Sequence, residues 1–158
     1  YHIEYEDTDE SINEVIIYHE TQEEADEREL IQAKQEKQQE NIDKCNEKRY
    51  SQEFMIFIQE QECLFDSTEQ TERDLMKAFM VTMDGVTTYD NWVTNNYITL
   101  NLTQKDVLII YERMNRAITP LYAVQKQYAE RIAEATTVEE VRAIVINYEI
   151  NTNIVDNN

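Results

Sequence analysis

The chain has 158 residues, a formal net charge of −19 and 41% hydrophobic residues. That hydrophobic content is too high for a disordered chain, and the length corresponds to one domain with room for a short appendage. The negative charge disfavours binding to nucleic acid or to an anionic membrane. We expect neither a transmembrane segment nor a signal peptide, because no run of about 18 apolar residues occurs and no basic segment precedes an apolar stretch.

The acidity is concentrated in the first half of the chain. Residues 1–74 carry 23 acids against 7 bases, a net −16, whereas residues 75–158 carry 10 against 7, a net −3. Only one glycine and one proline occur, which favours long helices over tight turns. Cys45 and Cys63 have no metal-binding or redox spacing, so we expect reduced thiols in a cytosolic setting.

Residues 1–20 have the pattern of an antiparallel hairpin. His2 to Glu6 alternates polar and apolar residues, and Asn13 to His19 is rich in β-branched and aromatic residues. Asp7 to Ser11 between them has turn composition. Its oxygen spacing resembles a calcium loop, but Ile12 and Tyr18 stand where that loop needs glycine and a bidentate acid.

Residues 21–52 are predicted to form a long polar helix. Thr21 and Glu24 have the spacing of a capping box, and the helix should continue to about Arg49. Its apolar content is thin, so it is a solvated spacer or, alternatively, one strand of a loose coiled coil. The residues of that alternative seam are Ile31, Gln38, Ile42 and Cys45.

Residues 53–147 are predicted to form a small helical domain with short strands. Apolar residues 54–58 and 63–65 flank a polar turn, Gln59 to Glu62, and predict a second hairpin or, alternatively, a buried helix end. A helix should begin near Glu69, after Ser67 or Thr68 as its cap, and end at Asp84-Gly85. Its predicted apolar face is Leu75, Phe79, Met80 and Met83. Residues 91–93 then predict a strand or an extended arm, residues 94–96 a turn and residues 97–100 a strand.

The rest of the chain is organised around an amphipathic helix over residues 103–135. Apolar residues recur at alternating gaps of four and three, a heptad pattern, with Thr103 and Asp106 as an approximate capping pair. Pro120 predicts either a kink in one helix or a fresh start. The apolar seam residues are Val107, Tyr111, Met114, Ile118, Leu121, Tyr128 and Ile132, with Gln125 as a polar interruption and Ala135 as the end.

After this helix, Thr137 and Glu140 form another capping box for a short helix that folds back on the long one. Residues 148–158 are expected to be a frayed tail. The predicted fold class is therefore mainly α with small β elements (α+β).

Recognisable catalytic motifs are absent, so we expect no enzyme, no cofactor and no metal site. One glycine excludes a phosphate-binding loop, and His2 and His19 both fall in the first predicted hairpin, away from any nucleophile motif. One feature invites another interpretation: an acidic cluster that could imitate nucleic-acid phosphates for a basic protein. Its members are Glu20, Glu23, Glu24, Asp26, Glu27 and Glu29.

Four short strings follow one another between residues 54 and 144. They are Cys63-Leu64-Phe65-Asp66, Asn91-Trp92-Val93-Thr94, Thr103-Gln104-Lys105-Asp106 and Ala135-Thr136-Thr137-Val138-Glu139-Glu140. In this order they resemble a small domain of tailed-phage proteins that belong to tail fibres, associate with the tail or help fibres assemble. The resemblance implies no catalytic residues. The hairpin and polar helix of residues 1–52 lie outside it and are candidates for contact with a specific partner.

The expectation is a non-catalytic phage structural or assembly protein that acts by protein–protein contact. It would be a tail or tail-fibre component in the virion, or a fibre chaperone in the host cytoplasm, and a homo- or hetero-oligomer with tail proteins. The seam of the long helix is the candidate partner interface, unless it is the monomer's own core. The alternative is an acidic, nucleic-acid-mimicking inhibitor of a host DNA-binding or defence protein.

Overall fold

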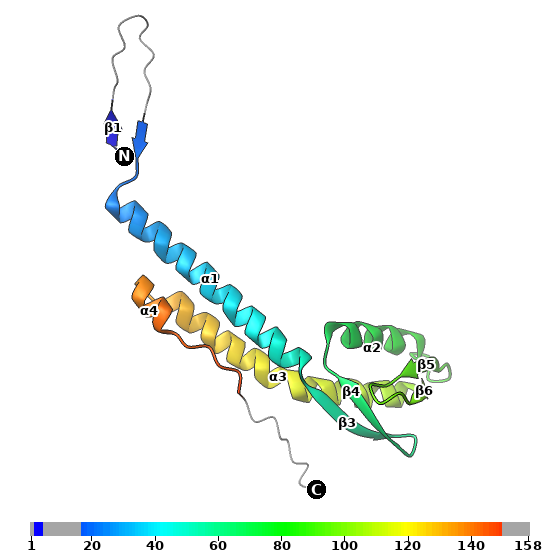
Figure 1. Ribbon diagram of the computed structural model, residues 1–158. Helices are drawn as coiled ribbons and strands as arrows, with labels where there is room; N and C mark the ends of the chain where they lie inside the picture. The colour runs from blue at the N-terminus through cyan, green and yellow to red at the C-terminus, as the bar shows by residue number, and fades with distance from the viewer. Residues whose placement is uncertain (1, 5–16, 150–158) are drawn as a thin grey trace, which may run out of the picture. The chain divides into compact units, whose positions relative to one another are not determined.

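The computed structural model describes residues 2–4 and 17–149. This part of the chain is α+β, with helices and small antiparallel strand pairs (Figure 1). The sheets of the described part are two-stranded and pair β1 with β2, β3 with β4, and β5 with β6. None of its helices combines the length and apolar character needed to cross a membrane. In chain order the elements are β1 (His2–Glu4), β2 (Ile17–His19), α1 (Gln22–Tyr50), β3 (Glu53–Ile58), β4 (Gln61–Asp66), α2 (Glu69–Val81), β5 (Tyr89–Val93), β6 (Thr99–Leu102), α3 (Gln104–Glu134) and α4 (Val138–Ala143).

The chain divides into two compact units. Residues 1–39 and 130–145 form the first, and residues 40–129 and 146–158 form the second. The first unit contains β1, β2, α4 and the beginning of α1, whereas the second contains strands β3–β6, α2, most of α3 and the end of α1.

In the first unit, β1 and β2 are antiparallel, with His2 opposite His19. The predicted turn at residues 7–11 and the predicted strand start at residue 13 lie outside the described residues. The capping box at the start of α1 is confirmed. The Thr21 N–H donates to the Glu24 carboxylate over 3.0 Å, and the Glu24 N–H donates to Thr21 Oγ1 over 3.2 Å.

The first unit buries apolar side chains of α3 and of α4 with its C-cap. Ile132, Val141 and Ile144 are buried there. Thr137 caps α4 by accepting from the Glu140 N–H over 3.2 Å, as predicted. The Glu140 carboxylate, however, accepts from the N–H and the hydroxyl of Thr136. The second hydrogen bond of the capping box, from the backbone to the Glu140 carboxylate, therefore comes from Thr136 and not from Thr137.

In the second unit, β3 and β4 form the predicted hairpin, but its turn is tighter than expected. Gln59 and Glu60 alone connect the strands and both have positive φ, 48° and 64°. Glu62, predicted as part of the turn, belongs to β4 and pairs with Phe57. Such two-residue turns follow the twist of the flanking strands, which fixes the register of the hairpin.

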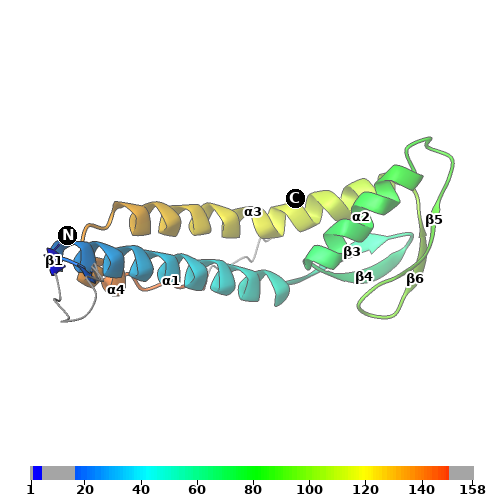
Figure 2. The same cartoon turned by 90° about the horizontal axis from the view of Figure 1, so that it is seen from above.

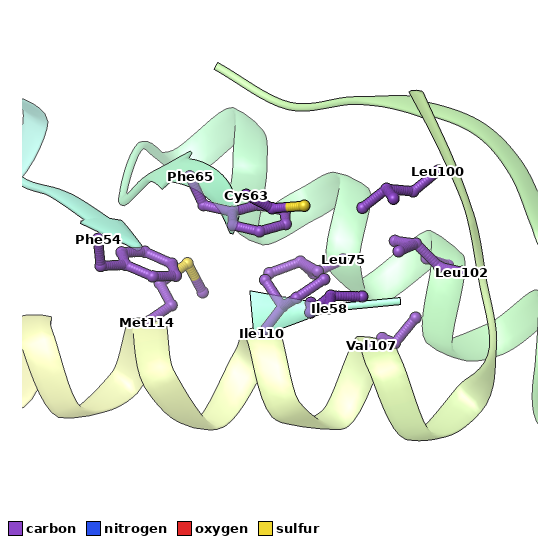
Figure 3. Close-up of a cluster of buried hydrophobic side chains, with 11 residues drawn as sticks. Phe54, Ile58, Cys63, Phe65, Leu75, Leu100, Leu102, Val107, Ile110 and Met114 are labelled. Carbon is purple, nitrogen blue, oxygen red and sulfur yellow. The ribbon is translucent and has the colours of Figure 1, made fainter. Parts of the chain in front are cut away.

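The core of the second unit lies between this hairpin, α2, β6 and α3. Strand alternation directs Phe54 and Ile58 of β3 and Cys63 and Phe65 of β4 to the same side (Figure 3). Figure 3 shows these side chains above the first turns of α3. The other buried members are Leu75, Ala78, Leu100, Leu102, Val107, Ile110 and Met114.

Helix α2 differs from its prediction in the face that it buries. Thr68 caps it, as one of the two predicted caps, and Gly85 has the expected positive φ of 72°. Leu75 is buried, but Met80 and Met83 are exposed. The reason is Thr82, which is buried with its hydroxyl donating to the Ala78 carbonyl over 2.8 Å. Because the Thr82 hydroxyl is satisfied by the carbonyl of its own helix, Thr82 can lie on the buried face of α2. Met80 and Met83 then lie on the exposed face.

Helix α3 is one continuous helix through Pro120, so the predicted alternative of a fresh start there is wrong. Its start has the predicted capping pair. The Thr103 N–H donates to Asp106 Oδ2 over 3.0 Å, and the Asp106 N–H donates to Thr103 Oγ1 over 3.2 Å. Pro120 has no N–H to donate to the Arg116 carbonyl, so α3 lacks one backbone hydrogen bond at this turn.

The inward face of α1 in the second unit is polar. Asn41, Cys45 and Arg49 are buried at successive turns. Of the predicted coiled-coil seam, Cys45 is buried and Gln38 is partly buried, whereas Ile31 and Ile42 are exposed. Buried Asn41 is accommodated by hydrogen bonds, since its Nδ2 donates to the Gln125 carbonyl over 2.9 Å. Sequence periodicity that counts only apolar residues cannot find such a face.

The predicted frayed tail does not begin at residue 148. Tyr148 is buried, and its hydroxyl donates to Asn41 Oδ1. The Lys44 ammonium donates to the Ile146 carbonyl over 3.1 Å, and the Asn147 N–H donates to the Tyr128 hydroxyl over 3.1 Å. Residues 146–149 are therefore held against α1 and α3 within the second unit.

Candidate interaction surfaces

The predicted interface seam of α3 lies inside the protein. Its aliphatic and methionine side chains are at most 3% exposed, and its two tyrosines are half-buried. The buried members are Val107, Met114, Ile118, Leu121 and Ile132, and the half-buried ones are Tyr111 and Tyr128. The seam therefore packs against the chain's own residues, and in this fold it is not open to a partner. This corrects its assignment as a partner interface.

The acidic cluster lies at the start of α1 and keeps most of its carboxylates on the surface. Some of them already have partners. Glu24 closes the capping box, where the backbone N–H of Thr21 lowers the pKa of its carboxyl, and Glu20 forms an ion pair with Arg28 at 3.0 Å. Asp26 accepts from Gln22. The cluster is thus a solvated helix start with local pairing, and no continuous stripe of unpaired charge runs along it.

Arg49 joins the end of α1 to α2 and α3 through a buried polar network. Its Nε donates to the Ser67 carbonyl over 2.7 Å, and its guanidinium pairs with Glu72 over 2.6 Å. The same guanidinium donates to the Tyr122 hydroxyl and lies 5.8 Å from the centre of that ring. Burial alone lowers the pKa of Arg49, but Glu72 outweighs it and the net pKa is raised. The group stays charged, and each of its three nitrogens donates a hydrogen bond, which fits a structural role.

A row of methionines follows the outward face of α2 and the turn after it. Met76, Met80 and Met83 are 49%, 64% and 57% exposed and follow one another at gaps of four and three. We call them the methionine stripe. Val86, just beyond the helix, is 86% exposed. The sequence could have shown this second apolar face, because α2 has apolar residues on more than one side of its helical wheel.

A second apolar surface follows β3. Met55 and Phe57 alternate with the core residues of the strand and are 49% and 69% exposed. Beside them is a groove of about 250 Å³ between β3 and one face of α3. The groove is lined by Met55, Ile56, Phe57, Ile109, Glu112, Arg113 and Arg116.

The turn between β5 and β6 covers the outer edge of β4. The Asn95 N–H donates to the Leu64 carbonyl over 2.8 Å, and Asn96 Oδ1 accepts from the Leu64 N–H over 2.9 Å. Next to them Tyr97 has a φ of 64° and is 89% exposed. These contacts place the turn where a third strand of the sheet would lie (Figure 2).

In the part of the chain that the structure describes, no group of three or more histidine, cysteine, aspartate or glutamate side chains could hold a metal ion. Cys45 and Cys63 are both buried free thiols, and burial raises the pKa of each. Comparison with protein-family models, with curated proteins and with solved structures gives no match to this chain.

Proposed function

We propose that this chain is a non-catalytic structural or assembly protein of a tailed phage that works through protein–protein contacts. It acts as a tail or tail-fibre component of the virion, or as a fibre chaperone in the host cytoplasm. Its partners are tail or fibre proteins. The resemblance of residues 54–144 to tail-associated domains supports the phage setting, and the surface of the second unit supports the mode of action.

The methionine stripe is the observation that carries the proposal. A helix of a soluble protein buries one apolar face and exposes polar residues on the other. Helix α2 buries Leu75 and Ala78 and still exposes Met76 and Met80, and Met83 in the turn after the helix is exposed as well. Contiguous exposed apolar side chains mark binding surfaces, and methionine suits them because its unbranched, polarisable side chain adapts to the partner.

Quantitative mass spectrometry of purified particles of the encoding phage tests the proposal. A fixed copy number that matches the threefold or sixfold symmetry of a tail supports the structural role. Presence in infected cells together with a fibre protein, but not in particles, supports the chaperone role. A chain absent from particles that co-purifies with no tail protein contradicts the proposal.

A matched pair of variants tests the stripe itself. Met80→Glu places a charge in the middle of the stripe, and Val145→Glu places one at a residue that is 77% exposed in the other unit. Both variants should fold, because both side chains lie on the surface. We expect Met80→Glu to reduce incorporation or fibre binding at least tenfold and Val145→Glu to leave it unchanged. Equal behaviour of the two variants would contradict this use of the stripe.

The second candidate function is acidic inhibition of a host nucleic-acid-binding or defence protein. The observation in its favour is that Glu23, Glu27 and Glu29 remain exposed at the start of α1. It requires binding to a basic host protein that weakens with added salt. Neutralising these three side chains to glutamine should abolish that binding, and binding that survives neutralisation removes this candidate.

A further inference from the structure

One face of the β3–β4 hairpin lies outside the core. Strand alternation directs Phe54 and Phe65 into the core and their sequence neighbours to the opposite side. Three apolar side chains lie on that side: Met55 and Phe57 are exposed, and Leu64, directly opposite Met55, is half-buried. We call this surface the outer face of the hairpin. Its residues are Glu53, Met55, Phe57, Glu62, Leu64 and Asp66.

The charged side chains of the outer face are all acidic. Glu53 and Asp66 stand directly opposite each other at one end of the hairpin, and Glu62 stands opposite Phe57 near the other end. The turn adds Glu60, and residues 53–66 contain no lysine, arginine or histidine. The outer face is therefore an apolar centre with carboxylates at both ends.

In the part of the chain that the structure describes, no cation pairs with these carboxylates. The Nδ2 of Asn95 lies 3.3 Å from a carboxylate oxygen of Glu53 and 3.3 Å from one of Asp66, but an amide carries no charge. The other donors to Asp66 are hydroxyls and a backbone N–H. Glu60 and Glu62 are exposed, and their side chains bind none of the described residues. Like charges directly opposite each other in a sheet are destabilising, so a cation near Glu53 and Asp66 would relieve a repulsion that the fold leaves in place.

The cations of the neighbouring groove already have partners. The α3 wall of that groove carries Arg113 and Arg116. Arg116 pairs with Glu112, and Arg113 has its own interaction within the chain. Among the described residues, neither arginine pairs with an acid of the outer face. The negative charge of the outer face is therefore left for a partner to balance.

These charges decide which occupant fits the outer face. A second copy of the chain would bring the same acids, and each copy has a formal net charge of −19, so like-charge repulsion opposes self-association here. Nucleic acid and anionic membranes are opposed for the same reason. A partner with lysine or arginine side chains is attracted instead, and apolar side chains beside those cations would cover Met55 and Phe57.

We propose that the outer face of the hairpin binds a basic amphipathic segment of another protein. The apolar side chains of this segment cover Met55 and Phe57, two residue types that are enriched in protein interfaces. Its lysine or arginine side chains lie against Glu53 and Asp66 at one end and against Glu62 at the other. Charge complementarity of this kind steers association and selects partners. The inference goes beyond the proposed function, because it requires neither a phage setting nor the methionine stripe.

NMR titration of the isotope-labelled full chain tests the proposal with a defined probe. The probe is a short synthetic peptide of alternating lysine and leucine, which combines positive charge with apolar side chains. We expect it to shift the backbone amide signals of residues 53–66, and we expect its binding to weaken as salt is added. The amide signals of residues 20–29, which contain the acidic cluster of α1, give the comparison within the same spectrum.

Two further peptides separate charge from apolar contact. A peptide of alternating lysine and serine keeps the charge but lacks the apolar side chains. A peptide of alternating glutamate and leucine keeps the apolar side chains and reverses the charge. We expect the lysine–serine peptide to bind the outer face at least about tenfold more weakly than the lysine–leucine peptide, and the glutamate–leucine peptide not to bind it.

Matched variants identify the residues that bind. Phe57→Ser removes the most exposed apolar side chain of the outer face, and the double variant Glu53→Gln with Glu62→Gln removes two of its charges. Each should weaken binding of the lysine–leucine peptide about tenfold and should stay folded by circular dichroism, since all three side chains are exposed. The control is Glu27→Gln with Glu139→Gln, two exposed acids of the other unit, which should leave binding at the hairpin unchanged.

Several outcomes would overturn the inference. Shifts confined to residues 20–29, or equally strong there and in residues 53–66, would show attraction to acidic residues in general. Equal binding of the lysine–serine and lysine–leucine peptides would remove the apolar contact, and wild-type binding by the folded variants would remove the named residues. Shifts in residues 53–66 that depend on protein concentration without peptide would assign the face to self-association. Because these measurements use the purified chain and the proposed function is tested on phage particles, either can fail without the other.

Discussion

The side-chain amide of Asn96 binds the backbone of Leu64 as a neighbouring strand would. It accepts a hydrogen bond from the Leu64 N–H over 2.9 Å and donates one to the Glu62 carbonyl over 2.8 Å. The Thr94 hydroxyl donates to the same amide oxygen over 2.8 Å, which fixes its orientation. One side chain thus joins the β5–β6 turn to the β3–β4 hairpin and closes the β4 edge.

Replacing Asn96 by alanine should lower the free energy of unfolding by about 1–2 kcal/mol, because two backbone groups of β4 lose their partners. Urea denaturation followed by circular dichroism measures the change. Asn95→Ala is the control, since the Asn95 side chain only makes 3.3 Å contacts with Glu53 and Asp66. A cost for Asn96→Ala no larger than that of the control would contradict this role.

The sequence predicts helix starts well, because capping depends on residues three apart. Thr21 with Glu24 and Thr103 with Asp106 were identifiable from spacing alone, and both close as expected. The pairing of residues 54–58 with 63–65 was also predicted, because a short polar turn between apolar runs favours a hairpin, although periodicity alone left a buried helix end as the alternative. Local chemistry decides these features, so local sequence shows them.

The candidate site could not be predicted, because it depends on which faces the tertiary fold covers. The heptad seam of α3 was the candidate interface, but its aliphatic and methionine side chains are buried in the core. Met80 was predicted to face the core, but it is exposed, and Thr82 at the end of α2 is buried instead. Asn41 and Arg49 are polar, so the spacing of apolar residues in the sequence does not predict that they are buried. Their burial depends on acceptors as distant in sequence as Gln125 and Ser67.

Arg49→Met should lower the free energy of unfolding by about 2–4 kcal/mol, because it removes a buried cation and leaves the Ser67 carbonyl and Glu72 without it. Arg49→Lys should cost less, since it keeps the charge but not the planar guanidinium geometry. Arg73→Met is the matched control on an exposed pair with Glu69 and should change stability by less than about 0.5 kcal/mol. Equal costs at residues 49 and 73 would contradict the structural role of the network.

Asp66 should make stability depend on pH in the acid range. Burial alone raises the pKa of its carboxyl, but hydrogen bonds from Thr71, Thr68 and Asn95 outweigh burial and the net pKa is lowered. Because the folded pKa lies below the unfolded value of about 3.9, the group stabilises the fold above that pH. This contribution is lost as the pH falls through the folded pKa.

We therefore expect Asp66→Asn to flatten the dependence of the unfolding free energy on pH below about pH 4, measured by urea denaturation at several pH values. Glu62→Gln, which removes an exposed carboxyl from the same strand, is the matched control. Identical pH profiles for wild type and Asp66→Asn would show that the carboxyl does not contribute in this way.

Tyr148→Phe should expose Cys45 to alkylation. The Tyr148 hydroxyl donates to Asn41, and both it and the Cys45 thiol are enclosed where residues 146–149 cross the second unit. Loss of that bond should favour local opening and raise the labelling rate of Cys45 about fivefold, as mass spectrometry of maleimide adducts would measure. Cys63, buried under the hairpin, is the internal reference. A parallel rise at both thiols would indicate global destabilisation instead.

Charged substitutions in the α3 seam distinguish a core role of these residues from an interface role. Ile118→Asp or Leu121→Asp places a carboxylate where the wild-type side chain is at most 3% exposed. Each should cost about 3–5 kcal/mol and remove much of the helical circular dichroism, because a buried charge has no partner there. Leu108→Asp, on the exposed side of the same helix, should retain the fold. If Ile118→Asp stayed fully helical and lost only its binding to another protein, the seam would be an interface after all, and the packing of α3 against α1 in the second unit would be wrong.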